Sequence, residues 1–100
     1  MYTYTTPTIT CTIEGVEFGS VDCVRIAIKG KGPEVLKIVP VADIDTEEGT
    51  AEIKLTQEET AAIGKGQVAI QARIRYTDGT VQATNKVLKD MNDVIDKVVI

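Results

Sequence analysis

The sequence predicts an all-β domain of short antiparallel strands with a single short helix. Val, Ile and Thr are abundant, and these β-branched residues favour the pleated, half-buried surface of a sheet. Apolar and polar residues alternate with a period of two in several segments, and Gly, Pro or Asp residues separate these segments. The chain has 100 residues, which suffices for one core, so residues 1–100 are expected to form a single domain.

The first half of the chain contains four predicted strands, at residues 8–13, 22–29, 34–41 and 50–55. A turn of Gly and Pro residues at 30–33 separates the second strand from the third, and an acidic turn at 43–49 precedes the fourth. Both faces of the third strand are apolar, so it is expected to lie centrally or to bend between two sheets. Pro40 instead favours an edge or a bulge, because proline donates no ladder hydrogen bond.

The hydrophobic period changes after the fourth strand, and this change predicts a helix near residues 57–63. Thr56 and Glu59 have the spacing of a capping box, in which each side chain accepts a hydrogen bond from the other residue's backbone. Gly64 follows as a helix stop.

The second half contains the longest predicted strand, Gly66 to Tyr76, where strict alternation indicates one buried and one wet face. Asp78 and Gly79 predict a tight hairpin turn, with both residues at positive φ. The return strand is expected to end near Lys89.

The C-terminal stretch has mixed signals. A helical turn is expected at residues 92–96, with Asp90, Asp93 and Asp96 on one solvated side. The apolar residues Val98, Val99 and Ile100 are then expected to dock on the domain or to meet a partner.

Six to seven short strands with one crossover helix predict an antiparallel β-sandwich of immunoglobulin-like type, with a partly open barrel as the alternative. The Cys…Trp…Cys pattern of antibody domains is absent, since the chain contains no Trp.

The residues for catalysis are sparse, and the chain is not expected to be an enzyme. It contains no His, the commonest general base and metal ligand. Cys23 is the one nucleophile candidate, and only Arg25 on the same strand face would activate it. Cys11 is predicted to point into the core, so the two thiols would face opposite sides and are not expected to form a disulfide.

No cofactor or metal site is expected either. Asp43, Asp45, Glu47 and Glu48 resemble a calcium loop in their spacing but lack its central Gly and distal Glu, so a solvated turn is expected. Gly64 to Gly66 is too short to cradle a phosphate and precedes a strand.

The net charge and the hydropathy of the chain argue against nucleic acid and a membrane as partners. The formal net charge is −4, which argues against nucleic acid. No segment approaches the roughly 20 apolar residues that a membrane span needs. The first residues lack the pattern of a secretory signal, so the chain is expected to stay in the cytoplasm of the cell that produces it.

Several motifs along the chain resemble those of small immunoglobulin-like proteins of Firmicutes phages and prophages. They are the segments at residues 6–9 (TPTI), 55–60 (LTQEET), 66–73 (GQVAIQAR), 78–80 (DGT) and 99–100 (VI). This resemblance implies a structural or accessory protein of a tail or baseplate, present in the virion if assembled. The charged end, residues 86–97, departs from the alternating strand of similar sequences.

Two functions are therefore open. The first is self-association or binding to other phage structural proteins, with Val98, Val99 and Ile100 as the interaction surface. The alternative is a carbohydrate- or host-surface-binding module that uses Tyr2 and Tyr4 on one face of an N-terminal strand. The partner, the oligomeric state and the presence of the chain in the mature particle stay open.

Overall fold

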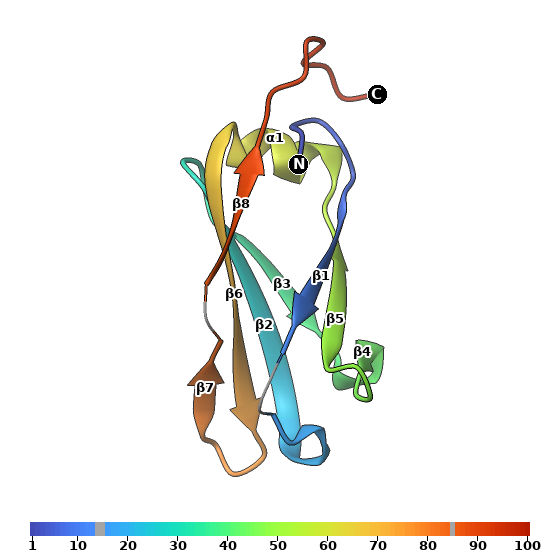
Figure 1. Ribbon diagram of the computed structural model, residues 1–100, viewed down its shortest axis with the longest axis vertical. Coiled ribbons are helices and arrows are strands. Elements are labelled where there is room, and N and C mark those ends of the chain that lie inside the picture. The colour runs from blue at the N-terminus through green and yellow to red at the C-terminus, as the bar shows by residue number, and fades with distance from the viewer. Residues whose placement is uncertain (14–15, 85) are drawn as a thin grey trace.

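The computed structural model describes residues 1–13, 16–84 and 86–100, and within them the chain is mostly β (Figure 1). These residues form eight strands in two antiparallel sheets, one α-helix and two 3₁₀ turns. The molecule is elongated, with extents of 47 × 21 × 18 Å. The predicted mostly β class with one short helix is confirmed, although the described residues form eight strands instead of the six to seven expected.

The larger sheet has five strands and is organised around β6 (Gly66–Tyr76). One edge of β6 pairs with β2 (Val21–Lys29), which in turn pairs with β3 (Val35–Val39). The other edge pairs with β7 (Val81–Ala83) near its end and with β8 (Val87–Met91) near its start.

The smaller sheet has three strands and covers one face of the larger one. Its order is β1 (Thr8–Thr12), β5 (Thr50–Lys54) and β4 (Ile44–Asp45). The hydrophobic core lies between the two sheets and draws buried side chains from both of them.

The alternation of the two longest strands places their apolar residues in this core. The buried side chains of β2 and β6 are Val21, Val24, Ile26, Ile28, Val68, Ile70, Ala72 and Ile74. Burying one aliphatic side chain of this size contributes about 1.5–3 kcal/mol, so the two strands supply a large part of the hydrophobic stabilisation. The face assignment made from the period of two is confirmed.

The third strand lies at an edge and also leads to the other sheet. β3 ends at Val39, two residues earlier than expected, because Pro40 begins the 3₁₀ turn η2 (Val41–Asp43). This turn carries the chain into β4, a two-residue strand that the acidic-turn prediction had missed. A strand of two residues is too short to show a period in the sequence.

The helix α1 (Gln57–Ile63) covers one end of the core (Figure 1). Thr56 and Glu59 form the predicted capping box, with hydrogen bonds of 2.9 and 3.1 Å. Gly64 ends the helix at a φ of 74°, a conformation that favours glycine.

The hairpin after β6 differs from the prediction in its turn. Gly79 has a φ of 90°, whereas Asp78 is not among the residues with positive φ. The Asp78 carboxylate instead accepts hydrogen bonds from the backbone and hydroxyl of Thr80, and these bonds lower the pKa of that carboxyl. The expectation of two positive-φ residues was therefore wrong.

The chain after this hairpin also differs from the prediction. The return strand divides into β7 and β8, and it continues to Met91 instead of ending near Lys89. Residues 92–100 form no helix, so the expected helical turn and the helical row of aspartates were wrong. The reason is that Asn92 bridges to Tyr2 and continues the chain in an extended form.

Candidate interaction surface

The two terminal segments lie side by side at the α1 end of the molecule (Figure 1). The Asn92 amide donates to the Met1 carbonyl, and the Thr3 amide donates to the Asn92 carbonyl, both at 2.8 Å. We call this end the terminal pole; it consists of the N-terminal segment (residues 1–7), α1 and the C-terminal tail (residues 92–100).

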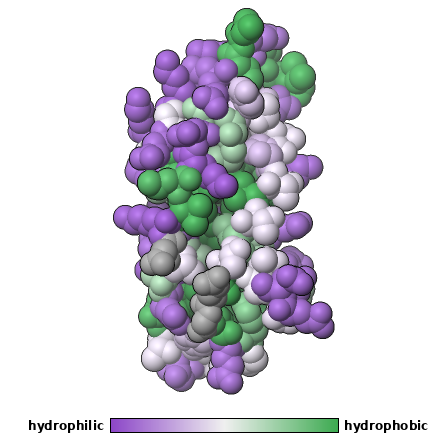
Figure 2. Space-filling view, in the orientation of Figure 1, coloured by the Kyte–Doolittle hydropathy of each residue, from purple (hydrophilic) through white to green (hydrophobic). Residues whose placement is uncertain are grey.

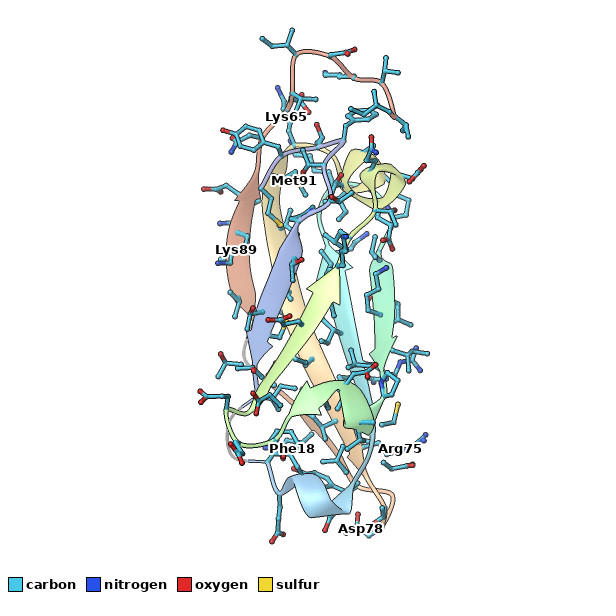
Figure 3. The ribbon with its side chains drawn as sticks, turned by 90° about the vertical axis from the view of Figure 1, so that its right-hand side faces the viewer. Phe18, Lys65, Arg75, Asp78, Lys89 and Met91 are labelled. Carbon is cyan, nitrogen blue, oxygen red and sulfur yellow. The ribbon has the colours of Figure 1, made fainter. Side chains whose placement is uncertain are left out.

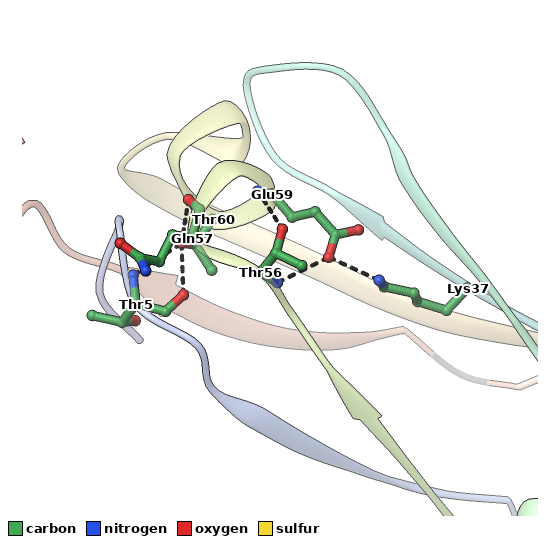
Figure 4. Close-up of polar contacts among 6 residues, drawn as sticks. All are labelled: Thr5, Lys37, Thr56, Gln57, Glu59 and Thr60. Atoms are coloured by element: carbon green, nitrogen blue, oxygen red, sulfur yellow. Dashed lines mark hydrogen bonds and ion pairs between the residues drawn. The ribbon is translucent and has the colours of Figure 1, made fainter. Parts of the chain in front are cut away.

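A buried hydroxyl on α1 fixes the N-terminal segment (Figure 4). Thr60 is fully buried, and its Oγ1 accepts a hydrogen bond from the Thr5 amide at 3.2 Å. The hydroxyl proton faces two carbonyl oxygens, those of Thr5 at 3.0 Å and Gln57 at 3.1 Å. Since buried polar groups need partners, this hydroxyl connects the segment to the helix.

A second buried hydroxyl fixes the start of the tail. Thr3 is 2% exposed, and its Oγ1 donates to the Asp93 carboxylate and accepts from the Val94 amide, both at 3.4 Å. The Lys97 ammonium lies 3.3 Å from the same carboxylate. These contacts hold the tail close to the N-terminal segment.

The end of the tail contacts the first residue of α1. The Gln57 side-chain amide donates to the Ile100 carbonyl at 2.7 Å and accepts from the Ile100 amide at 2.9 Å. Both bonds are exposed to solvent and use the backbone of Ile100, while its side chain is 95% exposed.

Large apolar side chains stay exposed over this pole, and Figure 2 shows apolar surface at this end. They are Tyr2, Ile95, Val98, Val99 and Ile100. The tail therefore docks on the domain through its backbone and the Asp93 side chain, while these apolar side chains face solvent. An exposed apolar patch of this kind is typical of an interaction site.

The structure does not place Tyr2 and Tyr4 on one strand face. Tyr2 is 55% exposed and forms a single bridge with Asn92, whereas Tyr4 is half-buried. Tyr4 has a φ of 57° within a turn, so the alternation expected of a strand is lost. The strand face predicted for the two tyrosines was wrong.

The opposite side of α1 carries an ion pair with the larger sheet. The Lys37 ammonium lies 2.8 Å from the Glu59 carboxylate, which also caps the helix (Figure 4). Burial raises the pKa of Glu59, but the hydrogen bonds from Lys37 and Thr56 and the charge of Lys37 outweigh this effect. The net result is a lowered pKa.

A groove lies between the edges of the two sheets, beside β1 and β8, and Figure 2 shows apolar surface there. It has a volume of about 190 Å³ and is lined by Ile9, Cys11, Ile70 and Val87 among others. Burial raises the pKa of the Cys11 thiol, so the thiolate is disfavoured at this position.

The two cysteines and the acidic turn, which the sequence analysis considered as possible sites, lie in separate parts of the structure. Cys23 is a free, half-buried thiol on the larger sheet, whereas Cys11 is a free thiol on the smaller one. The Asp45 carboxylate accepts from the amides of Glu47 and Glu48, both at 3.1 Å, and so caps its own turn. Figure 3 shows Met91 and Lys65 at the α1 end of the molecule, far from Asp78.

Within the ranges that the structure describes, no three His, Cys, Asp or Glu side chains come together as metal ligands. No helix among those residues has the length and apolar character to cross a bilayer.

Sequence reasoning missed Thr3, Gln57 and Thr60, which build the pole. The bonds by which they join the termini to the helix and to each other span 43 to 91 residues, so no local pattern could reveal them. Comparisons with protein-family models, curated proteins and solved structures find no match for the chain.

Proposed function

We propose that the chain is a non-enzymatic structural or accessory component of a phage or prophage tail or baseplate, built as an immunoglobulin-like β-sandwich. It acts through protein–protein contacts at the terminal pole. The resemblance of its motifs to small phage proteins supports the class, and two antiparallel sheets around one core are compatible with the architecture.

The observation that carries the proposal is the group of exposed apolar side chains on a tail whose backbone is fixed. Ile95 is fully exposed and Ile100 is 95% exposed, while Gln57, Thr3 and Asp93 hold the chain between them. Each such side chain would contribute about 1.5–3 kcal/mol when a partner buries it. A tail that is already positioned loses less conformational entropy on binding.

The test combines particle composition with a tail variant. In induced cultures of the source strain, we expect the chain in density-gradient-purified particles at an abundance comparable to other tail proteins, measured by mass spectrometry. Replacing Val98, Val99 and Ile100 together by serine should remove it from particles without unfolding it. The matched control replaces Val87 and Leu88, which are 52% and 56% exposed on β8, and should leave incorporation unchanged.

Two outcomes contradict this proposal. One is a wild-type chain that is abundant in the lysate and absent from purified particles. The other is equal incorporation of the tail variant and the wild type, which would remove the terminal pole as the contact surface.

The alternative, a carbohydrate- or host-surface-binding module, rests on the exposure of Tyr2 at the same pole. Sugar rings stack on exposed aromatic faces, and Tyr4 is too buried to extend that platform. Binding on a glycan array that is lost in Tyr2→Ala would favour this alternative, and an array without signal would exclude it.

A further inference from the structure

The outer face of the larger sheet, turned away from the smaller sheet, carries all three arginines of the chain. Arg25 on β2 lies directly opposite Arg73 on β6, and Arg75 follows on the same face. Exposed aliphatic side chains surround them, namely Leu36, Ile38 and Val81. We call these six residues the arginine face; Figure 3 shows Arg75 projecting outward from the molecule.

Two of these arginines have no charge partner within the described part of the chain. Arg75 pairs with Asp22 at 2.8 Å, whereas no ion pair or hydrogen bond joins Arg25 or Arg73 to a described carboxylate. Like charges directly opposite each other on neighbouring strands are destabilising. The chain thus keeps an unfavourable pair that an external anion would relieve.

The space beside this pair suits a carboxylate-bearing protein segment. A shallow hollow of about 320 Å³ is lined by Arg25, Arg73, Leu36 and Glu34 among others, and Glu34 forms no ion pair with either guanidinium. Guanidinium groups bind carboxylates with two parallel hydrogen bonds, and the aliphatic neighbours add apolar contact.

The charge of the remaining chain disfavours a polyanion such as nucleic acid. The chain has eleven basic residues, and without these three arginines eight remain against fifteen acidic ones. A long polyanion on the arginine face would also approach the negatively charged remainder of the chain and be repelled by it. A short acidic loop would contact the arginines alone.

Such a loop exists on the opposite side of the same chain. Residues 38–53 contain no Lys or Arg, and four carboxylates fall within residues 43–48, on η2, β4 and the turn to β5. The side chains of Asp43, Glu47 and Glu48 are exposed and make no ion pair within the described residues. We call residues 43–48 the acidic loop.

The acidic loop cannot reach the arginine face of its own chain. It belongs to the smaller sheet, which covers the inner face of the larger sheet, and the core separates the two. We propose that the arginine face binds the acidic loop of a second copy of the chain, head to tail. Because two different surfaces meet, a bound pair keeps one free acidic loop on one copy and one free arginine face on the other, and further copies generate rings or filaments.

This self-association uses surfaces distinct from the terminal pole, so it can be tested independently of the proposed function. Sedimentation of the purified chain should show association at about 0.01 M ionic strength that weakens at about 1 M, where the Debye length falls from about 30 to about 3 Å. The double variant Arg25→Glu/Arg73→Glu should weaken this association at least about tenfold.

A charge exchange makes the test specific. Glu47→Lys/Glu48→Lys alone should also abolish association, because the loop would then carry no net negative charge and would place two lysines against the basic face. A mixture of the arginine variant and the loop variant should associate again. The unchanged arginine face of the loop variant can then bind the unchanged acidic loop of the arginine variant. The control Lys31→Glu/Lys65→Glu makes the same change of net charge on exposed lysines near α1 and should associate like wild type.

The folding of each variant is checked by circular dichroism and thermal unfolding, so that only folded chains are compared. A wild-type chain that stays monomeric at low ionic strength up to its solubility limit would overturn the proposal. Association that survives reversal of Arg25 and Arg73 would overturn it as well, as would a mixture that stays monomeric.

Discussion

The buried hydroxyl of Thr60 gives the sharpest test of how the terminal pole is built. Thr60→Val keeps the shape of the side chain but removes the acceptor of the Thr5 amide and the donor to the Thr5 carbonyl. A buried polar group that loses its partner costs about 1–3 kcal/mol. We expect the free energy of unfolding to fall by about that amount, because the part-buried Thr5 amide loses its hydrogen-bond acceptor.

The assay is urea unfolding followed by circular dichroism, together with hydrogen exchange at the Thr5 amide. Thr10→Val is the matched control, since Thr10 is exposed on β1 and should change stability by less than about 0.5 kcal/mol. A domain of this size shifts its Tm by about 4–8 °C per kcal/mol. Equal stability of Thr60→Val and wild type, with unchanged exchange at Thr5, would refute the role of this hydroxyl.

Three further predictions concern the core, the loop before β3 and the helix cap. Ile70→Asp should lower the free energy of unfolding by more than about 4 kcal/mol, since Ile70 is 3% exposed, whereas Gln67→Asp on exposed surface should be close to neutral in the same urea assay. Gly32→Ala should lower the Tm, because a Cβ there would lie 2.0 Å from the Ala62 carbonyl oxygen; an unchanged Tm would contradict this packing. The lowered pKa of Glu59 stabilises the fold above the ordinary carboxyl pKa of 4.5 and loses that contribution as the pH falls through the lower folded value. Stability measured across this range should therefore decline less in Glu59→Gln than in wild type, and parallel curves would exclude the effect.

Features that depend on neighbouring residues could be predicted from the sequence. The alternation in β2 and β6 identified their buried faces, because successive side chains of any strand point to opposite sides. The capping box of Thr56 and Glu59 could also be identified, because its two residues are only three positions apart in the chain. In each case a short segment contains both partners of the interaction.

Features that depend on register and on the meeting of the termini required the tertiary structure. Periodicity predicted a helical turn at 92–96, but Asn92 pairs with Tyr2, and a pairing of residues 90 positions apart leaves no trace in local spacing. Likewise, Arg25 and Arg73 each look like ordinary wet-face residues in the sequence. Only the antiparallel register of β2 and β6 sets them opposite each other, because strand pairing joins residues that are 48 positions apart in the chain.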